Sequence, residues 1–268
     1  MDEIWEVYAL KYAERNGRTR QDSFILDDDH ASPHAMDYFV WVLRAGARTI
    51  LVDSGYDADE GARRGRPILR QPREALAPLG LSAEAIDTVI ISHLHYDHAG
   101  GLDAFPNATF HLQAAEMAYA TGPCMCPGPL QKPFTAAHVC AMVRRVFAGR
   151  VVFHEGDGVV APGVSVHCIG GHSRGLQAVR VKTGSGWLCL ASDAAHYYEN
   201  FQARKLFPIV VDADAMLRGF ETIQRLAERP ALVIPGHDPL VRAHFPRWRK
   251  DVDFIHRLDL GPNKPFSS

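Results

Sequence analysis

The sequence lacks several features that would place it in a large class of proteins. No apolar run in its 268 residues approaches the roughly 20 residues of a membrane-spanning helix, which argues against a membrane protein. The formal net charge is −2, so the chain has no overall positive charge with which to bind nucleic acid. Its five cysteines are an odd number without a disulfide-like spacing, which argues against a disulfide scaffold.

The remaining composition is that of an ordinary globular protein. The length is sufficient for one full hydrophobic core, and we expect a single domain over residues 1–268, as a monomer or a homodimer. The first residues, Met1 to Glu6, are acidic and lack the basic and apolar regions of a signal peptide. We therefore expect a cytoplasmic protein.

Four side chains that bind metals well lie within six residues: His93, His95, Asp97 and His98. They follow the apolar run Thr88 to Ile91, which is rich in β-branched residues and predicts a short buried strand. Alternation along an extended chain would place the first three on one side, while His98 breaks the alternation and reaches a second point. Imidazole and carboxylate together suit zinc and similar divalent metals, so this strand end predicts a metal site.

Three further segments have the same character. His172, Asp193 and His237 each come shortly after an apolar, strand-like segment. Strand ends that meet at one edge of a sheet are where α/β proteins build their sites. Together with the first cluster they would offer seven ligands, which is too many for one tetrahedral ion and suits two ions that share a carboxylate.

The His-x-His-x-Asp-His motif at residues 93–98 and the Leu-Val-Asp-Ser-Gly turn at residues 51–55 resemble the metallo-β-lactamase superfamily. Within that superfamily the chain most resembles the N-acyl homoserine lactone lactonases and related small-lactone hydrolases. The resemblance extends from Tyr38 through His237 to the tail at residues 257–259. It implies an α/β fold, an αββα sandwich of two mixed β-sheets flanked by helices. The alternation of predicted strands and helices in two similar halves favours the same fold.

The resemblance also implies a role for each ligand. His93, His95 and His172 would bind the first metal, Asp97, His98 and His237 the second, and Asp193 would bridge both. The expected cofactor is two divalent metal ions, with Zn²⁺ first and Mn²⁺ or Fe²⁺ as alternatives. Asp53 would support the site by accepting a hydrogen bond from a ligand histidine.

The implied reaction is the opening of a lactone ring by a metal-bound hydroxide, with a small-molecule lactone or ester as substrate. A serine nucleophile is not needed for this chemistry. Asp97 has a second candidate role, passing a proton to the leaving oxygen. The lactonases carry a tyrosine three residues after the bridging aspartate, where it contacts the substrate carbonyl. Here that position is His196, and His196, Tyr197 and Tyr198 are the candidates to replace it.

Other functions stay open at this point. A thioester hydrolase of the glyoxalase II type shares the metal motif, but the basic residues 242–250 do not match its glutathione-binding order. A further ester or amide hydrolase of the superfamily is a second alternative. A nuclease or phosphodiesterase would need more positive charge, and a binding protein without metal would not need seven intact ligands.

One long segment, Thr121 to Phe134, contains two glycines and four prolines and predicts irregular structure. Its apolar residues Met125, Leu130 and Phe134 suggest a lid or a wall of the substrate pocket. The Cys124-x-Cys126 pair within it could belong to a separate zinc site, but no second cysteine pair exists to complete one.

Overall fold

The structure is a computed structural model that describes residues 2–126 and 128–263. Its strands form two sheets, with orders β12-β13-β1-β2-β3-β4-β5-β6 and β11-β10-β9-β8-β7. The first sheet contains β1 (Glu6–Arg15), β2 (Met36–Ala45), β3 (Arg48–Val52), β4 (Thr88–Ile90), β5 (Thr109–Gln113), β6 (Val151–His154), β12 (Arg247–Arg249) and β13 (Val252–Arg257). The second contains β7 (Gly158–Ala161), β8 (Val164–Cys168), β9 (Gln177–Thr183), β10 (Gly186–Ser192) and β11 (Val233–Pro235).

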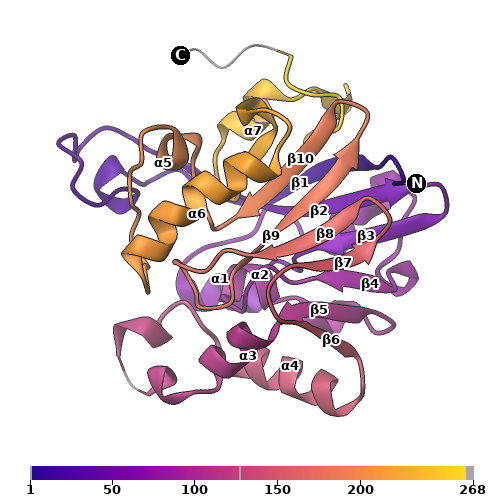
Figure 1. Ribbon diagram of the computed structural model, residues 1–268, viewed down its shortest axis with the longest axis horizontal. Helices are drawn as coiled ribbons and strands as arrows, with labels where there is room; N and C mark the ends of the chain where they lie inside the picture. Colours follow the sequence, from indigo (N-terminus) through magenta and orange to yellow (C-terminus); the bar gives the residue numbers. More distant parts are fainter. Residues whose placement is uncertain (1, 127, 264–268) are drawn as a thin grey trace.

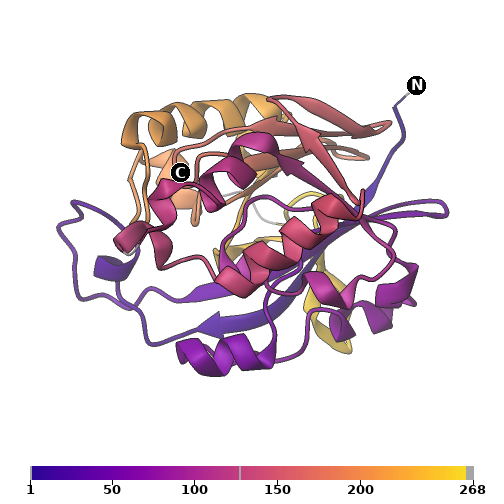
Figure 2. The same cartoon turned by 90° about the horizontal axis from the view of Figure 1, so that it is seen from below.

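Both sheets are mixed, as predicted. The run β3-β4-β5-β6 is parallel and the rest of the first sheet is antiparallel. In the second sheet β11 lies parallel to β10, and the other pairs are antiparallel. The helices are α1 (Ala58–Arg64), α2 (Tyr96–Ala99), α3 (Ala114–Ala120), α4 (Ala136–Phe147), α5 (Tyr198–Gln202), α6 (Ala213–Leu226) and α7 (Leu240–His244). Figure 1 shows α3 and α4 below β5 and β6, and Figure 2 shows α6 and α1 on opposite outer sides of the molecule.

The layers follow from residues that alternate between two cores. Val7 and Ala9 of β1 point toward the second sheet, whereas Tyr8, Leu10 and Tyr12 point toward the helices on the other side. Because successive side chains of a strand face opposite ways, a strand that is apolar at every position is buried on both faces. The sheet thus lies inside the sandwich, and the predicted αββα fold is confirmed.

Helix α6 covers the outer face of the second sheet. Its buried residues Met216, Phe220 and Ile223 recur at helical spacing. The side chain of Asp212 caps the helix by accepting a hydrogen bond from the backbone N–H of Ala215 at 2.9 Å. Within residues 2–126 and 128–263, no helix is both long and apolar enough to pass through a lipid bilayer.

One local sequence prediction needs correction. The residues from Arg70 to Pro78 have the pattern of a short amphipathic helix, but the structure forms a 3₁₀ helix at Glu74–Leu79. Pro78 cannot continue an α-helical hydrogen-bond ladder, and Gly80 ends the turn in the left-handed conformation. Strand β1 is not among the predicted strands, because Lys11 interrupts its apolar run; in the structure Lys11 is buried and pairs with Asp37 at 2.9 Å.

The ends of four strands bring the ligand segments together. β4 runs into His93, β8 leads to the turn before His172, β10 ends directly before Asp193, and β11 ends shortly before His237. At one of these ends Gly171 has a φ of +82°, and a Cβ there would lie 2.7 Å from the backbone of Met216 in α6. The glycine therefore allows the turn that carries His172 to approach the helix.

We expect Gly171→Ala to lower the free energy of unfolding by roughly 1–3 kcal/mol, because alanine adds both backbone strain and a clash with α6. Urea unfolding monitored by circular dichroism measures the change. Gly184→Ala is the matched control, since Gly184 has open space around it and no left-handed φ. Equal unfolding midpoints for the two variants would contradict this account of Gly171.

Candidate active site

The seven predicted ligands lie together in the interior. Four sets of donor atoms lie within 4.8 Å of one another: His93, His95 and His172; Asp97, His98 and His237; Asp193 with His93 and His98; and Asp193 with His172 and His196. All of these side chains are buried or nearly so. The first two sets are the two trios that the sequence resemblance implied, and Asp193 lies against both.

The first trio presents three imidazole nitrogens to one point. His95 Nδ1 lies 3.0 Å from His93 Nε2 and 2.9 Å from His172 Nε2. Metal–nitrogen bonds of 2.0–2.1 Å at a tetrahedral ion separate neighbouring ligand atoms by about 3.3 Å. The spacing of the three nitrogens is close to that edge length.

Asp193 faces each trio with a different oxygen. Its Oδ1 lies 3.0 Å from His237 Nε2 and 3.3 Å from His98 Nε2. Its Oδ2 lies 3.2 Å from His172 Nε2 and 3.8 Å from His93 Nε2. One carboxylate oxygen directed at each trio is the geometry that a bridging ligand needs.

Asp97 completes the second trio from helix α2 and not from the extended chain that the sequence predicted. Its two oxygens lie 3.9 Å from His98 Nε2 and from His237 Nε2. The expected extended alternation is wrong beyond His95, because the chain turns there into α2. The phenol of Tyr12 donates to the carbonyl of Asp97 at 2.8 Å, and the backbone N–H of Ser54 donates to that of His98 at 2.8 Å, which fixes the helical turn.

Asp53 holds the second trio from outside, as expected. Its Oδ2 accepts a hydrogen bond from His98 Nδ1 at 2.7 Å, and its Oδ1 accepts one from the backbone N–H of Ser92, also at 2.7 Å. Asp53 also lies in a turn, where its backbone has a φ of +61°. His237 is oriented in the same way by the backbone carbonyl of Asp37, 2.9 Å from its Nδ1. Such contacts leave the opposite ring nitrogen free to bind a metal.

Glu116 is a positioning residue that the sequence did not reveal. It is fully buried in α3 and accepts hydrogen bonds from the backbone N–H of Leu94 (2.9 Å), the hydroxyl of Ser173 (2.6 Å) and the backbone N–H of Gly175 (2.9 Å). It therefore joins the loop of the His-x-His motif to the loop that carries His172. An acidic residue in a predicted helix gave no signal of this role.

The residues fit two divalent ions on grounds of their own chemistry. His98 Nε2 and Asp193 Oδ1 are buried and make no hydrogen bond within the described residues, although they lie 3.3 Å apart. Buried polar atoms rarely stay without partners, because the lost hydration costs free energy. Burial also lowers the pKa of His93 and His95 well below the usual range, which keeps both rings in the neutral form that binds metals.

Of the three candidates after the bridging aspartate, only His196 reaches this centre. Its Nε2 lies 2.9 Å from Asp193 Oδ2, and its ring stacks on Phe207. Burial lowers the pKa of His196 to about 3 and so keeps it neutral. The ring of Tyr197 instead packs on His34, and its hydroxyl accepts a hydrogen bond from Ser23.

Tyr197 and Tyr198 are thus placed away from the ligands. Tyr197 immediately precedes α5, where its backbone N–H donates to Asn200, and this turn directs its ring away. The backbone N–H of Tyr198 donates to Asp238, and its ring packs on Phe201. The prediction of Tyr197 as a substrate-contacting residue therefore has no support in the geometry.

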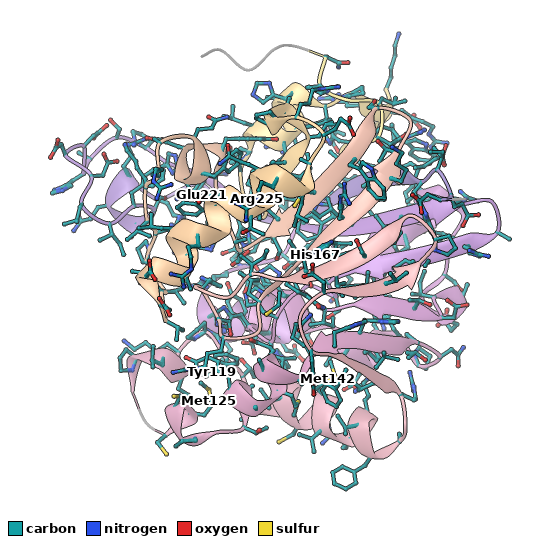
Figure 3. All side chains as sticks on the ribbon, viewed as in Figure 1. Tyr119, Met125, Met142, His167, Glu221 and Arg225 are labelled. Atoms are coloured by element: carbon teal, nitrogen blue, oxygen red, sulfur yellow. The ribbon has the colours of Figure 1, made fainter. Side chains whose placement is uncertain are left out.

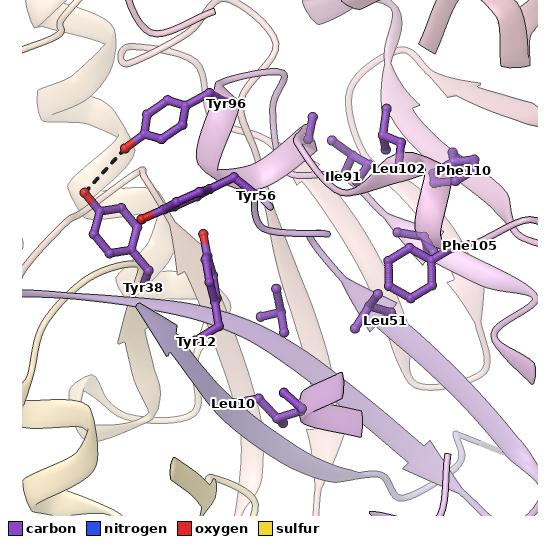
Figure 4. Packing of buried hydrophobic residues seen from close by; sticks show 14 of the residues in the cluster. Leu10, Tyr12, Tyr38, Leu51, Tyr56, Ile91, Tyr96, Leu102, Phe105 and Phe110 are labelled. Atoms are coloured by element: carbon purple, nitrogen blue, oxygen red, sulfur yellow. Dashed lines mark hydrogen bonds between the residues drawn. The ribbon is translucent and has the colours of Figure 1, made fainter. Parts of the chain in front are cut away.

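A small cavity of about 80 Å³ opens onto the ligands and reveals residues that the sequence reasoning missed. It is lined by Tyr38 and Tyr96, whose hydroxyls are 3.4 Å apart (Figure 4), and by Arg15, Arg18 and Arg66. Tyr96 could have been found from its place inside the metal motif. Nothing in the sequence marked the arginines.

The predicted pocket wall forms only at its C-terminal end. Pro133 lines the small cavity, and the ring of Phe134 meets His95 edge-on at 4.6 Å. Met125 lies in a short 3₁₀ turn that packs on α3 beside Tyr119 (Figure 3), where it lines a separate cavity of about 550 Å³. None of the seven ligands lines that second cavity. Residue 127 of this segment lies outside the described residues.

Residues 171–175 read Gly-His-Ser-Arg-Gly, which is the spacing of a serine-hydrolase nucleophile turn. Ser173 is fully buried, and its hydroxyl donates to Glu116 rather than to a histidine. Since a serine nucleophile needs an adjacent base and an exposed hydroxyl, Ser173 is a structural residue.

Comparison with known proteins matches residues 36–261 to the model of the metallo-beta-lactamase superfamily. The N-acyl homoserine lactonase AttM of Azorhizobium caulinodans is 30% identical over 180 residues, which are 65% of this chain and 67% of that relative. The next four curated lactonases are matched over 60–65% of their length.

Solved structures show the same fold. An N-acyl homoserine lactone hydrolase with N-hexanoyl-L-homoserine bound at its catalytic metal centre superposes with a TM-score of 0.74 at 21% identity, over 91% of this chain and 96% of that one. The dizinc quorum-quenching lactonase AidC gives a TM-score of 0.69 at 18% identity, over 89% of each chain. Because the family model matches residues 36–261, most of this chain, the chain belongs to the metallo-beta-lactamase superfamily.

Proposed function

We propose that this protein is a dinuclear metal-dependent hydrolase that opens the ring of a small lactone. The observation that carries the proposal is Asp193, whose two oxygens each face a separate trio of donors at 3.0–3.8 Å. The lactonase names of the most similar curated relatives support a cyclic ester as the bond that is cleaved. Five imidazoles and two carboxylates favour Zn²⁺ as the bound ion.

The two trios and Asp193 would hold two divalent ions, which would supply an activated water and a Lewis acid, the chemistry that ester hydrolysis needs. The chain contributes the positions of the groups around them. Asp53, Asp37 and Glu116 fix the ligands or their loops through short hydrogen bonds. The cavity is small, about 80 Å³, and the ligands on its wall are buried, which limits the water that can surround the reacting bond.

Asp97 is suited to carry the proton that the leaving oxygen needs. Of the two carboxylates in the centre, it is the more exposed, at 11% of its side chain against 4% for Asp193, and it lines the cavity. His196 holds Oδ2 of Asp193 from the opposite side and restricts the rotation of that carboxylate. We assign Asp97 to proton transfer and His196 to positioning.

The proposal is tested by a hydrolysis panel on protein of measured metal content. It contains acyl-homoserine lactones, an aromatic lactone, S-lactoylglutathione and a β-lactam. We expect lactones to be opened with the highest kcat/KM. Rapid cleavage of S-lactoylglutathione by protein with two metals that opens no lactone would replace the lactonase proposal with a thioesterase.

Metal analysis should find close to two ions per chain. Asp193→Ala should lose ions from both positions, because its carboxylate faces both trios, whereas His237→Ala should mainly lose the second. Elemental analysis after reconstitution with Zn²⁺ measures both, and His30→Ala, an exposed loop histidine, is the control. Full metal content in both variants would refute the ligand assignment.

Asp97→Asn should lower kcat for lactones by ~10²–10⁴-fold, the usual contribution of one acid–base group. The amide keeps an oxygen for the metal but cannot release a proton to the leaving group. Since the same residue is an assigned ligand, the comparison is made on samples with equal metal content. An unchanged kcat at two ions per chain would remove Asp97 from proton transfer.

A further inference from the structure

We propose that Arg15, Arg18 and Arg66 form a carboxylate-binding subsite beside the metal ligands, so that the substrate is a small lactone bearing a carboxylate group. The inference rests on the proposed function and narrows its substrate class. The three arginines come from different parts of the chain: the end of β1, the loop after it, and the segment that follows α1. All three line the small cavity together with the ligands His95, Asp97 and His172.

The three guanidinium groups have no carboxylate partner. In the part of the chain that the structure describes, no ion pair within 4.0 Å involves any of them. Other partly buried arginines vary: Arg242 pairs with Asp37 and Arg257 with Asp259, whereas Arg150 and Arg180 donate to backbone carbonyls. The group of three differs from all of these because each member lines the cavity beside the metal ligands.

Arg18 is the most informative of the three, because it is only 8% exposed. Its Nη2 donates to the backbone carbonyl of Asp22 at 2.6 Å and to the hydroxyl of Ser23 at 3.2 Å. Its Nε is buried and has no hydrogen-bond partner among the described residues. A buried donor without a partner is costly, and an anion in the cavity would satisfy it.

Arg66 and Arg15 face the cavity beside the tyrosine pair. Arg66 donates to the hydroxyl of Tyr96 and lies over its ring, which leaves its remaining N–H groups available. The side chain of Arg15 makes no hydrogen bond within the described residues. Burial raises the pKa of Tyr38, and Arg15 lies near enough to lower it in part. The hydroxyl of Tyr38 accepts a hydrogen bond from Tyr96, so the polar wall continues from the tyrosines to the arginines.

With two divalent ions bound, the charges on the cavity wall would not balance. The described wall has three arginines and three aspartates, Asp22, Asp97 and Asp193, so the charge of the two ions would leave it net positive. The carboxylate of Asp22 also accepts the backbone N–H of Thr19 at 3.0 Å. Grouping like charges away from water costs free energy unless an anion joins them. The planar fork of arginine matches a carboxylate, with two parallel hydrogen bonds.

The size of the cavity limits the rest of the substrate. Its volume of about 80 Å³ compares with ~300–1,000 Å³ for sites that enclose drug-sized ligands. A ring of a few atoms with one carboxylate suits this space, whereas a long acyl chain does not. The larger apolar cavity beside Met125 is lined by none of the three arginines.

The decisive comparison uses 5-oxotetrahydrofuran-2-carboxylate and its carboxamide, which share ring and shape and differ in charge. We expect the carboxylate to have a kcat/KM roughly 10–150-fold higher, the range for hydrogen bonds to a charged group. Arg15→Gln and Arg66→Gln should each lower kcat/KM for the carboxylate by a larger factor than for the carboxamide. Arg48→Gln, whose arginine pairs with Glu3 at a distant hairpin, is the matched control.

A binding measurement separates this inference from the proposed function. Glutarate, which has no ester bond, should bind to the metal-loaded wild-type protein in calorimetry and bind more weakly to Arg15→Gln and Arg66→Gln. If both lactones are opened equally and glutarate does not bind, the subsite is refuted while the lactonase function stands. If neither lactone is opened but glutarate binds through the arginines, the subsite stands and the proposed function fails.

Discussion

The structure depends on one constraint: five imidazoles and two carboxylates must be held against each other in the interior, with their metal-binding atoms left free. Two nitrogens lie 2.9–3.0 Å from Nδ1 of His95, but this atom of a neutral ring has one N–H or one lone pair and can make only one good hydrogen bond without an ion between the rings. This arrangement persists because other contacts fix each ring. Asp53 binds His98 and the carbonyl of Asp37 binds His237, so rotation of either ring would break a short hydrogen bond in a buried place.

The same constraint explains where the backbone is strained. Of the five described non-glycine residues with a left-handed φ, Asp53 and Ser192, at +61° and +45°, lie beside the ligands. Each is at the end of a strand beside the ligands, and the hydroxyl of Ser192 donates to that of Ser92 at 2.9 Å across the two sheets. Such angles persist only where surrounding contacts impose them. The two sheets meet at the edge where these strands end, and their packing supplies those contacts. The rigid sheets therefore fix the orientation of the short loops that carry the ligands.

The donors of the centre were predictable, and its walls were not. The residues His93 to His98 are adjacent in the sequence and directly follow an apolar run. Their side chains therefore predict metal binding, and the apolar run predicts that they lie at the end of a strand. The fold class followed from the same resemblance. By contrast, Glu116 reads as a helix surface residue, and its burial depends on two distant loops closing over it. Arg66 is one of several arginines in this part of the sequence, and nothing local distinguishes it. Tyr197 is adjacent to His196, but the turn before α5 directs its ring away from the ligands. Tertiary contacts of this kind carry no local pattern.

The division between donors and walls also bears on how the site acquires specificity. The metal donors stand on strand ends, which the two sheets fix together, so they tolerate little change. Tyr38, Arg18 and Arg66 come from β2 and from loops on the rim, which can vary without disturbing a donor.

The histidine at position 196 fits this division. By binding Asp193 it has joined the donor centre, and the phenol groups that face the cavity come instead from Tyr38 and Tyr96. These phenols and the arginines therefore form one polar surface of the cavity, which Arg66 joins by donating directly to Tyr96.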